Sequence, residues 1–329
     1  MSKGLPPFST HSFPDGLDPE RGASRTCQDS QRTLFLLGRR QGAHFAHYEV
    51  YAAIMILSDL HTHTHHSHGT DTVEAMILAA IEKNIRVLGF SEHDPRPANF
   101  SYPSDYQDKL NRQFPIYVGE VRALQGRYRE KIHVLLGVEF DFFPGHEARI
   151  AVECRDFDFD YAIGAVHFLS EWGFDFAAGD WQGLSQDALF EVYERYFEIV
   201  GQMAGSGLFQ IAAHLDLVKI FSGQSFAAWI DAGCGDKLLD RALEAMADFN
   251  MALEVSSAGL RKPCREIYPC PRIMTLARQK SIPIALASDA HTIGQLGFGF
   301  DQLLKYVREF GYETSVWFED GVLAQLPLG

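Results

Sequence analysis

Histidine and carboxylate residues recur directly after short apolar runs of this 329-residue sequence, and this pattern is typical of a metal site. The first run continues into His61 and His63, and the last run continues into Asp289 and His291. Residues two apart in an extended strand point to the same side, so each of these pairs can bind one ion. Neutral imidazole together with carboxylate suits zinc, iron or manganese better than magnesium, which prefers oxygen ligands.

The other apolar runs supply similar residues at the same register. The candidates are His68 in the first loop, then His93, Glu139, His167, His214 and Glu254 after successive runs. Together these candidates outnumber the roughly four ligands of a single zinc site, so we expect two or three divalent ions. Several ions together favour hydrolysis at phosphorus, because they hold the phosphoryl oxygens, lower the pKa of a bound water and stabilise the leaving oxygen.

Seven buried strands must position these residues. The predicted strands are residues 55–60, 85–90, 132–138, 161–166, 208–213, 251–255 and 282–287. Between them lie segments with helical apolar periodicity, at residues 71–84, 104–130, 185–203, 236–250 and 270–280. Alternating strands and helices predict a parallel sheet covered by helices, and at this length an α/β barrel is the favoured closure. In such a barrel, functional residues collect at the carboxyl ends of the strands.

The predicted barrel occupies residues 55–329. Residues 1–54 show little apolar periodicity and are expected to be a disordered extension, with Met55 as an alternative start of translation. The five cysteines are too scattered for a disulfide framework, which indicates the cytoplasm. A formal net charge of −14 argues against a nucleic-acid partner. No apolar run approaches the roughly 20 residues of a membrane span.

The ordered set of motifs resembles the polymerase and histidinol phosphatase (PHP) family, and within it the histidinol-phosphatase branch. The motifs are His-x-His, Ser-Glu-His-x-Pro, Gly-x-Glu, Val-His-Phe, His-Leu-Asp and Ser-Asp-Ala-His, together with the run EVSSAGLRKP at residues 254–263. The resemblance covers roughly residues 55–329 and implies a distorted, TIM-like barrel of seven strand–helix units. It also implies a metal-dependent phosphomonoesterase that cleaves L-histidinol phosphate in histidine biosynthesis.

The resemblance also implies a distribution of the ligands over three ions. The first ion would take His61, His63, Glu139 and Asp289; the second would take Glu139, His167 and His214; the third would take His68, His93 and His291. His66 is an alternative to His68, because the loop between the first strand and its helix departs from the family pattern. Of these ligands, Glu139, His214 and Asp289 are the residues on which we expect catalysis to depend most directly.

Four residues are candidates for holding the substrate. Arg261 and Lys262 are expected to bind phosphate, Arg261 as a bidentate fork and Lys262 as a point charge. Arg96 is a weaker candidate for the same role. Glu254 is expected either to orient a metal ligand or to pair with the substrate amine.

Two other functions remain open at the level of sequence. One is a PHP phosphoesterase that acts on another small phosphate or on a nucleotide. The other is a metal-binding scaffold without catalytic activity. An amidohydrolase is disfavoured, because that family typically has a metal-bridging lysine at a strand end and none of the seven strand ends supplies one.

Overall fold

The computed structural model describes residues 57–97, 100, 105–319 and 321–328. The expected disordered extension, residues 1–54, lies outside the described residues.

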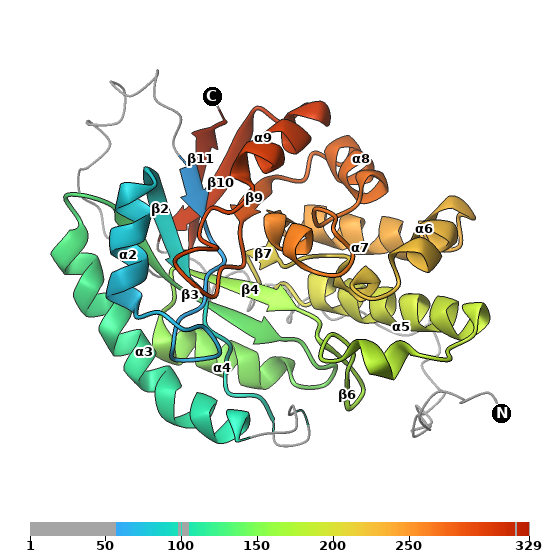
Figure 1. Ribbon diagram of the computed structural model, residues 1–329, viewed down its shortest axis with the longest axis horizontal. Helices are drawn as coiled ribbons and strands as arrows, with labels where there is room; N and C mark the ends of the chain where they lie inside the picture. Colours follow the sequence, from blue (N-terminus) through green and yellow to red (C-terminus); the bar gives the residue numbers. More distant parts are fainter. Residues whose placement is uncertain (1–56, 98–99, 101–104, 320, 329) are drawn as a thin grey trace, which may run out of the picture. The chain divides into compact units, whose positions relative to one another are not determined.

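Seven parallel strands form one sheet, and their order in the sheet is their order along the chain (Figure 1). They are β1 (Leu57–Asp59), β2 (Ile85–Phe90), β3 (His133–Asp141), β4 (Tyr161–Ala165), β7 (Ile211–Ala212), β8 (Ala252–Ser256) and β9 (Ile284–Ala287). All seven overlap the strands predicted from the sequence, in the same order. Nearly every described strand residue is buried, which explains their continuous apolar composition.

Contacts of the segment after β1 with β9 and with the residues after β9 nearly close this sheet into a barrel. The amide of Leu60 donates to the carbonyl oxygen of Leu286 (3.1 Å), and Thr62 forms a parallel bridge with Ala290. Beneath this seam, the carboxylate of Asp59 accepts hydrogen bonds from the amide (2.8 Å) and the hydroxyl (2.5 Å) of Ser288. The predicted seven-stranded barrel is therefore confirmed.

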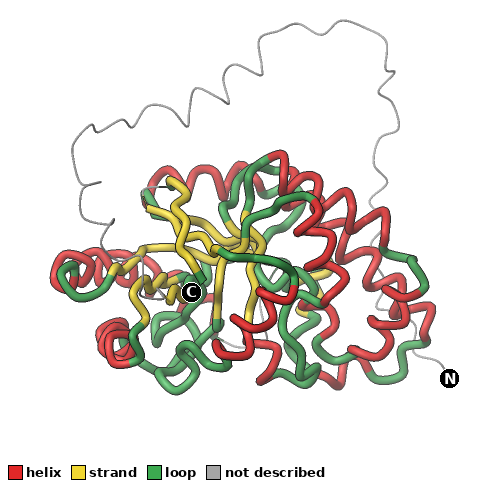
Figure 2. The backbone as a smooth tube through the Cα atoms, turned by 90° about the horizontal axis from the view of Figure 1, so that it is seen from above, coloured by secondary structure: helices red, strands yellow, loops and turns green. Residues whose placement is uncertain are grey.

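Eight α-helices are described, and they lie outside the strands (Figure 2). They are α2 (Val73–Glu82), α3 (Tyr106–Tyr128), α4 (Glu147–Phe157), α5 (Gln186–Gly205), α6 (Gly223–Asp231), α7 (Asp236–Asp248), α8 (Pro271–Gln279) and α9 (Phe300–Glu309). Five match the predicted helices, whereas α4, α6 and α9 were not predicted. Helix α4 buries only Ile150, so its apolar pattern is weak. None of the described helices is long and apolar enough to cross a membrane.

A C-terminal hairpin packs against the interior of the barrel. Its strands are β10 (Thr314–Glu319) and β11 (Val322–Pro327), which pair antiparallel. Trp317 belongs to the same buried apolar cluster as the barrel side chains Leu135 and Ile163, and its ring contacts that of His133 at the start of β3 (4.4 Å). The hairpin therefore lies at the amino ends of the strands, which leaves the carboxyl ends to form the functional site.

One interior side chain requires two glycines as neighbours. The hydroxyl of Tyr161 donates to the carbonyl oxygen of Leu60 (2.6 Å), and its ring lies between Gly89 and Gly137. A Cβ atom added at Gly89 would lie 2.1 Å from the Tyr161 hydroxyl oxygen, and one added at Gly137 would lie 2.3 Å from the ring. A Cβ atom has a fixed position on the backbone, so no change of side-chain rotamer at residue 89 or 137 can relieve such contacts.

We expect Gly89→Ala to destabilise the fold by about 1–3 kcal/mol, the usual cost of overpacking a core. Urea denaturation followed by circular dichroism measures this change in the free energy of unfolding. Gly119→Ala is the matched control, because Gly119 lies in α3 with no atom within 4 Å of the added Cβ. This control should stabilise the protein by about 0.5–1 kcal/mol, since alanine is the better helix former. Equal stability of Gly89→Ala and the wild type would contradict the packing described here.

Candidate metal centre

The nine predicted metal ligands lie at the carboxyl ends of the barrel strands and in the loops that follow. His61, His63 and His68 follow β1, His93 follows β2, Glu139 lies in β3, His167 and His214 follow β4 and β7, and Asp289 and His291 follow β9. Their side chains converge. Measured between ring centroids, His63 lies 4.7 Å from His93 and 4.5 Å from His291, and His167 lies 5.1 Å from His214.

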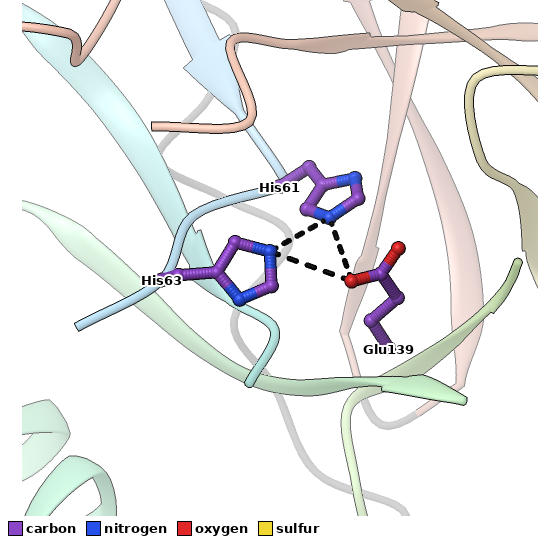
Figure 3. Close-up of side chains that lie close together, drawn as sticks. All are labelled: His61, His63 and Glu139. Carbon is purple, nitrogen blue, oxygen red and sulfur yellow. Dashed lines mark hydrogen bonds and ion pairs between the residues drawn. The ribbon is translucent and has the colours of Figure 1, made fainter. Parts of the chain in front are cut away.

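Four donor atoms form the first group of ligands. His61 Nε2 lies 3.0 Å from His63 Nε2 and 3.3 Å from Glu139 Oε2, and His63 Nε2 lies 3.4 Å from the same oxygen (Figure 3). Asp289 Oδ1 lies 3.4 Å from His63 Nε2 and 3.8 Å from His61 Nε2. Donor atoms of a tetrahedral zinc site lie about 3.4 Å apart, given bonds of about 2.0–2.2 Å. The four atoms therefore have the spacing of a single ion site.

Glu139 connects this group to a second one. Its other carboxylate oxygen, Oε1, lies 3.2 Å from His214 Nε2 and 3.5 Å from His167 Nε2. Because the two oxygens of one carboxylate face two sets of imidazoles, Glu139 is placed to bridge two ions. His93 lies beside both groups, with its Nδ1 3.0 Å from Glu139 Oε2.

His68, His93 and His291 form a third cluster. The His68 ring lies 4.9 Å from that of His93 and 4.0 Å from that of His291, and the Nε2 atoms of His68 and His291 are in direct contact. His66, the alternative to His68, points instead toward α3, where its two ring nitrogens contact Gln113 and Glu120. Of the two alternatives, the structure thus brings His68 into the centre.

The electrostatics of Glu139 fit a cationic ligand. Three imidazole nitrogens, from His61, His63 and His93, lie within 3.4 Å of Oε2, yet among the described residues this buried oxygen accepts no hydrogen bond. Burial alone would raise the pKa of Glu139, but attraction to His61, His93 and His167 outweighs it and holds the pKa well below its usual value. A charged carboxylate at the centre of an imidazole cluster has the donor set that divalent first-row metals prefer.

The three imidazoles of the third cluster have lowered pKa values. Burial lowers the pKa of His93 to about 4 and that of His291 to about 3, and it also lowers the pKa of His68 well below its ordinary value. Repulsion from His291 and His93 adds to the effect on His68. These three imidazoles are therefore neutral near pH 7, which is the form that coordinates metals.

Glu254 lies beneath the ligands and orients two of them. Its Oε2 accepts a hydrogen bond from His61 Nδ1 (2.6 Å), and its Oε1 accepts one from the backbone amide of His214 (3.1 Å). The first contact leaves His61 Nε2 free to coordinate. Glu254 has an exposed fraction of 1% and both of its oxygens are engaged, which favours the orienting role over pairing with the substrate amine.

Arg96 and Arg261 also have structural partners. The guanidinium of Arg96 is buried, pairs with Asp141 and lies over the ring of Phe168, and these contacts favour a supporting role over its predicted role in substrate binding. Arg261 donates to the backbone oxygens of Ser288 (2.8 Å) and Asp289 (2.9 Å) and thereby fixes the loop after β9. The structure places Lys262 close enough for its charge to lower the pKa of both Asp289 and His291.

Two supporting carboxylates were not predicted. Asp141 Oδ1 accepts a hydrogen bond from His167 Nδ1 (2.6 Å), and Glu92 accepts hydrogen bonds from the amide (2.6 Å) and the hydroxyl (2.5 Å) of Thr64. The spacing of Glu139 and Asp141 was the available signal for the first, since residues two apart on β3 point to the same side. Glu92 also contacts Ser67 and thus holds the loop that carries His68.

We expect Asp141→Asn to lower kcat/KM about 10–100-fold, because residues that hydrogen-bond to metal ligands typically have effects of this size. The amide keeps the shape of the side chain but is a weaker, uncharged acceptor for His167 Nδ1. The ring of His167 is then held less firmly with its Nε2 toward Glu139. Metal affinity, measured by competition with a chelator, should fall with activity. Asp156→Asn is the control, because Asp156 is a carboxylate in α4 that is 57% exposed, and it should keep both activity and metal affinity. An Asp141→Asn protein with normal metal affinity would contradict the orienting role.

A parallel barrel whose strand ends converge on buried histidines and carboxylates is typical of metal-dependent hydrolases. Residues 59–258 match the family model of the PHP domain, and this chain belongs to the PHP family.

Two relatives of this chain are named as histidinol-phosphatases. The "Probable histidinol-phosphatase" of Deinococcus radiodurans is 36% identical over 259 residues, which cover 78% of this chain and 95% of that protein. The histidinol-phosphatase of Bacillus subtilis is 27% identical over 264 residues, which cover 75% of this chain and 98% of that protein. The resemblance to the histidinol-phosphatase branch is thereby confirmed.

A solved structure has the same fold. It is histidinol phosphate phosphatase from Lactococcus lactis in complex with zinc, L-histidinol and phosphate, with a TM-score of 0.66 and 20% identity. The alignment covers 82% of this chain and 98% of that chain.

Proposed function

We propose that this protein is a metal-dependent phosphomonoesterase that hydrolyses L-histidinol phosphate to L-histidinol and phosphate, a step of L-histidine biosynthesis. The observation that carries the proposed chemistry is the cluster around Glu139, where the spacing and the charge of the donor atoms suit several divalent ions. The names of the relatives from Deinococcus radiodurans and Bacillus subtilis support the substrate.

The chain offers ligands for two or three ions of zinc, iron or manganese. The first would be held by His61, His63, Glu139 and Asp289, the second by Glu139, His167 and His214, and the third by His68, His93 and His291. Ions bound there would polarise the phosphoester and supply a nucleophilic oxygen near neutral pH. Zinc is the first ion to test, since the Lactococcus lactis protein is complexed with it.

Protein side chains would bind and orient the substrate around this centre. Lys262, whose charge acts on Asp289 and His291, is the candidate for holding the phosphate. Arg261 contributes mainly by fixing the loop that carries Asp289, although its partly buried guanidinium lies on the same side of the barrel. The carboxylates of Glu254, Asp141 and Glu92 each contact the Nδ1 atom of one ligand imidazole, and these contacts would keep the Nε2 atoms directed toward the ions.

We also propose that residues 55–329 form the catalytic unit and that the protein acts in the cytoplasm on a small molecule. Support for the first comes from the matched family segment, residues 59–258. Support for the second comes from Cys154, Cys234, Cys264 and Cys270, which are all unpaired thiols. The formal net charge of −14 opposes binding of a nucleic acid.

Phosphate release from L-histidinol phosphate by the purified protein tests the proposal. The protein is loaded with zinc, manganese or iron and compared with a chelated sample and with a panel of other phosphomonoesters. Metal-dependent turnover with a strong preference for L-histidinol phosphate is the expected result. Equal turnover of the whole panel would retain the chemistry and reject the substrate, and no turnover with any metal would reject the enzymatic function.

A further inference from the structure

A second group of potential metal ligands lies outside the predicted centre. Among the described residues, four groups of histidines and carboxylates have donor atoms within 4.8 Å of one another. Three of these groups consist of ligands already assigned above. The fourth consists of His65, His66 and Glu120, and it shares no residue with the other three.

The tight loop after β1 separates these two histidines from the centre. Residues 65–68 form a turn, and the chain folds back so closely that a Cβ atom at Gly69 would lie 2.8 Å from the backbone of His63 and Thr64. The loop is further fixed by the amide of His65, which donates to the carbonyl oxygen of Asp71 (2.9 Å). As a result, His68 points into the centre, whereas His66 points toward α3.

His66 is held between two oxygen atoms of α3. Its Nε2 lies 2.7 Å from Glu120 Oε2, and its Nδ1 lies 3.0 Å from Gln113 Oε1. His66 is buried, with an exposed fraction of 3%, and the centroid of its ring lies 6.0 Å from that of Tyr117. Both ring nitrogens of His66 therefore face oxygen atoms that α3 carries.

His65 completes the group from the same turn. Its ring lies 4.2 Å from that of His66, and its Nδ1 is buried without a hydrogen-bond partner among the described residues. Buried polar atoms normally have a partner, so an unpaired nitrogen next to an imidazole and a carboxylate is unusual. Glu120 is less buried, with 32% of its side chain exposed, which leaves a path from solvent.

We propose that His65, His66 and Glu120 bind one additional divalent transition-metal ion, with zinc as the best match. Two imidazoles and a carboxylate are a known zinc donor set that leaves a position for water. Tetrahedral zinc holds its donors about 3.4 Å apart, so His66 and Glu120 need to separate by less than about 1 Å to admit the ion. The ion would tie the loop after β1 to α3. It would stabilise the fold without contacting the substrate.

Metal stoichiometry of the full-length protein tests this proposal independently of the proposed catalytic function. Chelator-stripped protein is titrated with zinc in competition with a chromogenic chelator, and the bound metal is counted by elemental analysis. Glu120→Gln and His66→Gln should each bind one equivalent of zinc fewer than the wild type. Glu120→Gln should retain phosphatase activity within a few-fold of the wild type once the centre is loaded.

Two control variants separate the loss of a ligand from other effects. Gln113→Ala removes a hydrogen bond to His66 but none of the three ligands, and Glu130→Gln removes an exposed carboxylate, 85% exposed, near the end of α3. Both should bind as much zinc as the wild type. If His66→Gln does not fold, Glu120→Gln still tests the proposal, because a partly exposed residue tolerates substitution better than a buried one.

Anomalous diffraction from zinc-soaked crystals provides a second readout, with a peak expected among His65, His66 and Glu120. A Glu120→Gln protein that binds as many zinc ions as the wild type, with unchanged affinity, would overturn the proposal. The three residues would then form only a hydrogen-bonded contact between the loop and α3.

Discussion

Glu139→Gln should lower turnover of the substrate on the order of 10³-fold or more, the largest effect expected from any single substitution in this chain. The carboxylate of Glu139 faces His61, His63 and His93 with one oxygen and His167 and His214 with the other. An amide keeps the volume of the side chain but removes the negative charge and one of the two bridging oxygens. Two ion sites are therefore weakened at once.

The same variant should lose bound metal in parallel. Elemental analysis after gel filtration should show a deficit of at least one equivalent, and phosphate release should be measured at saturating metal. Glu130→Gln, which removes an exposed carboxylate, is the control and should keep both metal and activity. Because glutamine has nearly the same shape as glutamate, the Glu139→Gln protein should remain folded by circular dichroism. Near-normal turnover would refute the role of Glu139 as a bridge.

Asp289→Asn should also reduce turnover on the order of 10³-fold, through the loss of a charged ligand of the first ion. Burial alone would raise the pKa of Asp289, but attraction to His291, His63 and His61 holds it well below the usual value, so the residue is a carboxylate near pH 7. Its backbone has a φ of 49° in the left-handed region, which asparagine adopts more readily than most residues. The substitution therefore removes charge with little change in backbone conformation.

Thermal unfolding distinguishes this loss of chemistry from a loss of structure. The melting temperature of metal-free Asp289→Asn should stay close to that of the metal-free wild type, while turnover falls. Asp301→Asn, an exposed carboxylate in the first turn of α9, is the matched control and should be fully active. A variant that keeps wild-type kinetics would show that Asp289 is not a ligand of the reacting centre.

The barrel and the ligand cluster could be predicted from the sequence because both follow from regular periodicity. Parallel strands bring their carboxyl ends to one rim, so residues such as Glu139 and His214 that end apolar runs must lie near one another. Within one strand end, residues two apart share a direction, which pairs His61 with His63. These arguments need only the order of the strands, and the structure has that order.

Helices and supporting residues were predicted less completely. Helix α9 was missed although Phe300, Leu303, Leu304 and Val307 have the spacing of a buried helical face. Asp141 was missed as the partner of His167, because a carboxylate near a metal site can be a ligand, a substrate contact or a support. Only the observed contact of 2.6 Å distinguishes these roles.

The sequence by itself determined the seven-stranded barrel, the family and the set of residues at the strand ends. Only the tertiary structure decided how the side chains outside the strands are directed, because a turn has no repeating geometry that fixes them. The choice of His68 over His66 depends on the close backbone approach at Gly69 and on the contact of His66 with Glu120. The supporting role of Arg96 likewise depends on the packing of β3 and its neighbours around Asp141. Long side chains with several rotamers take their direction from the groups around them, and those groups come together only when the chain is folded.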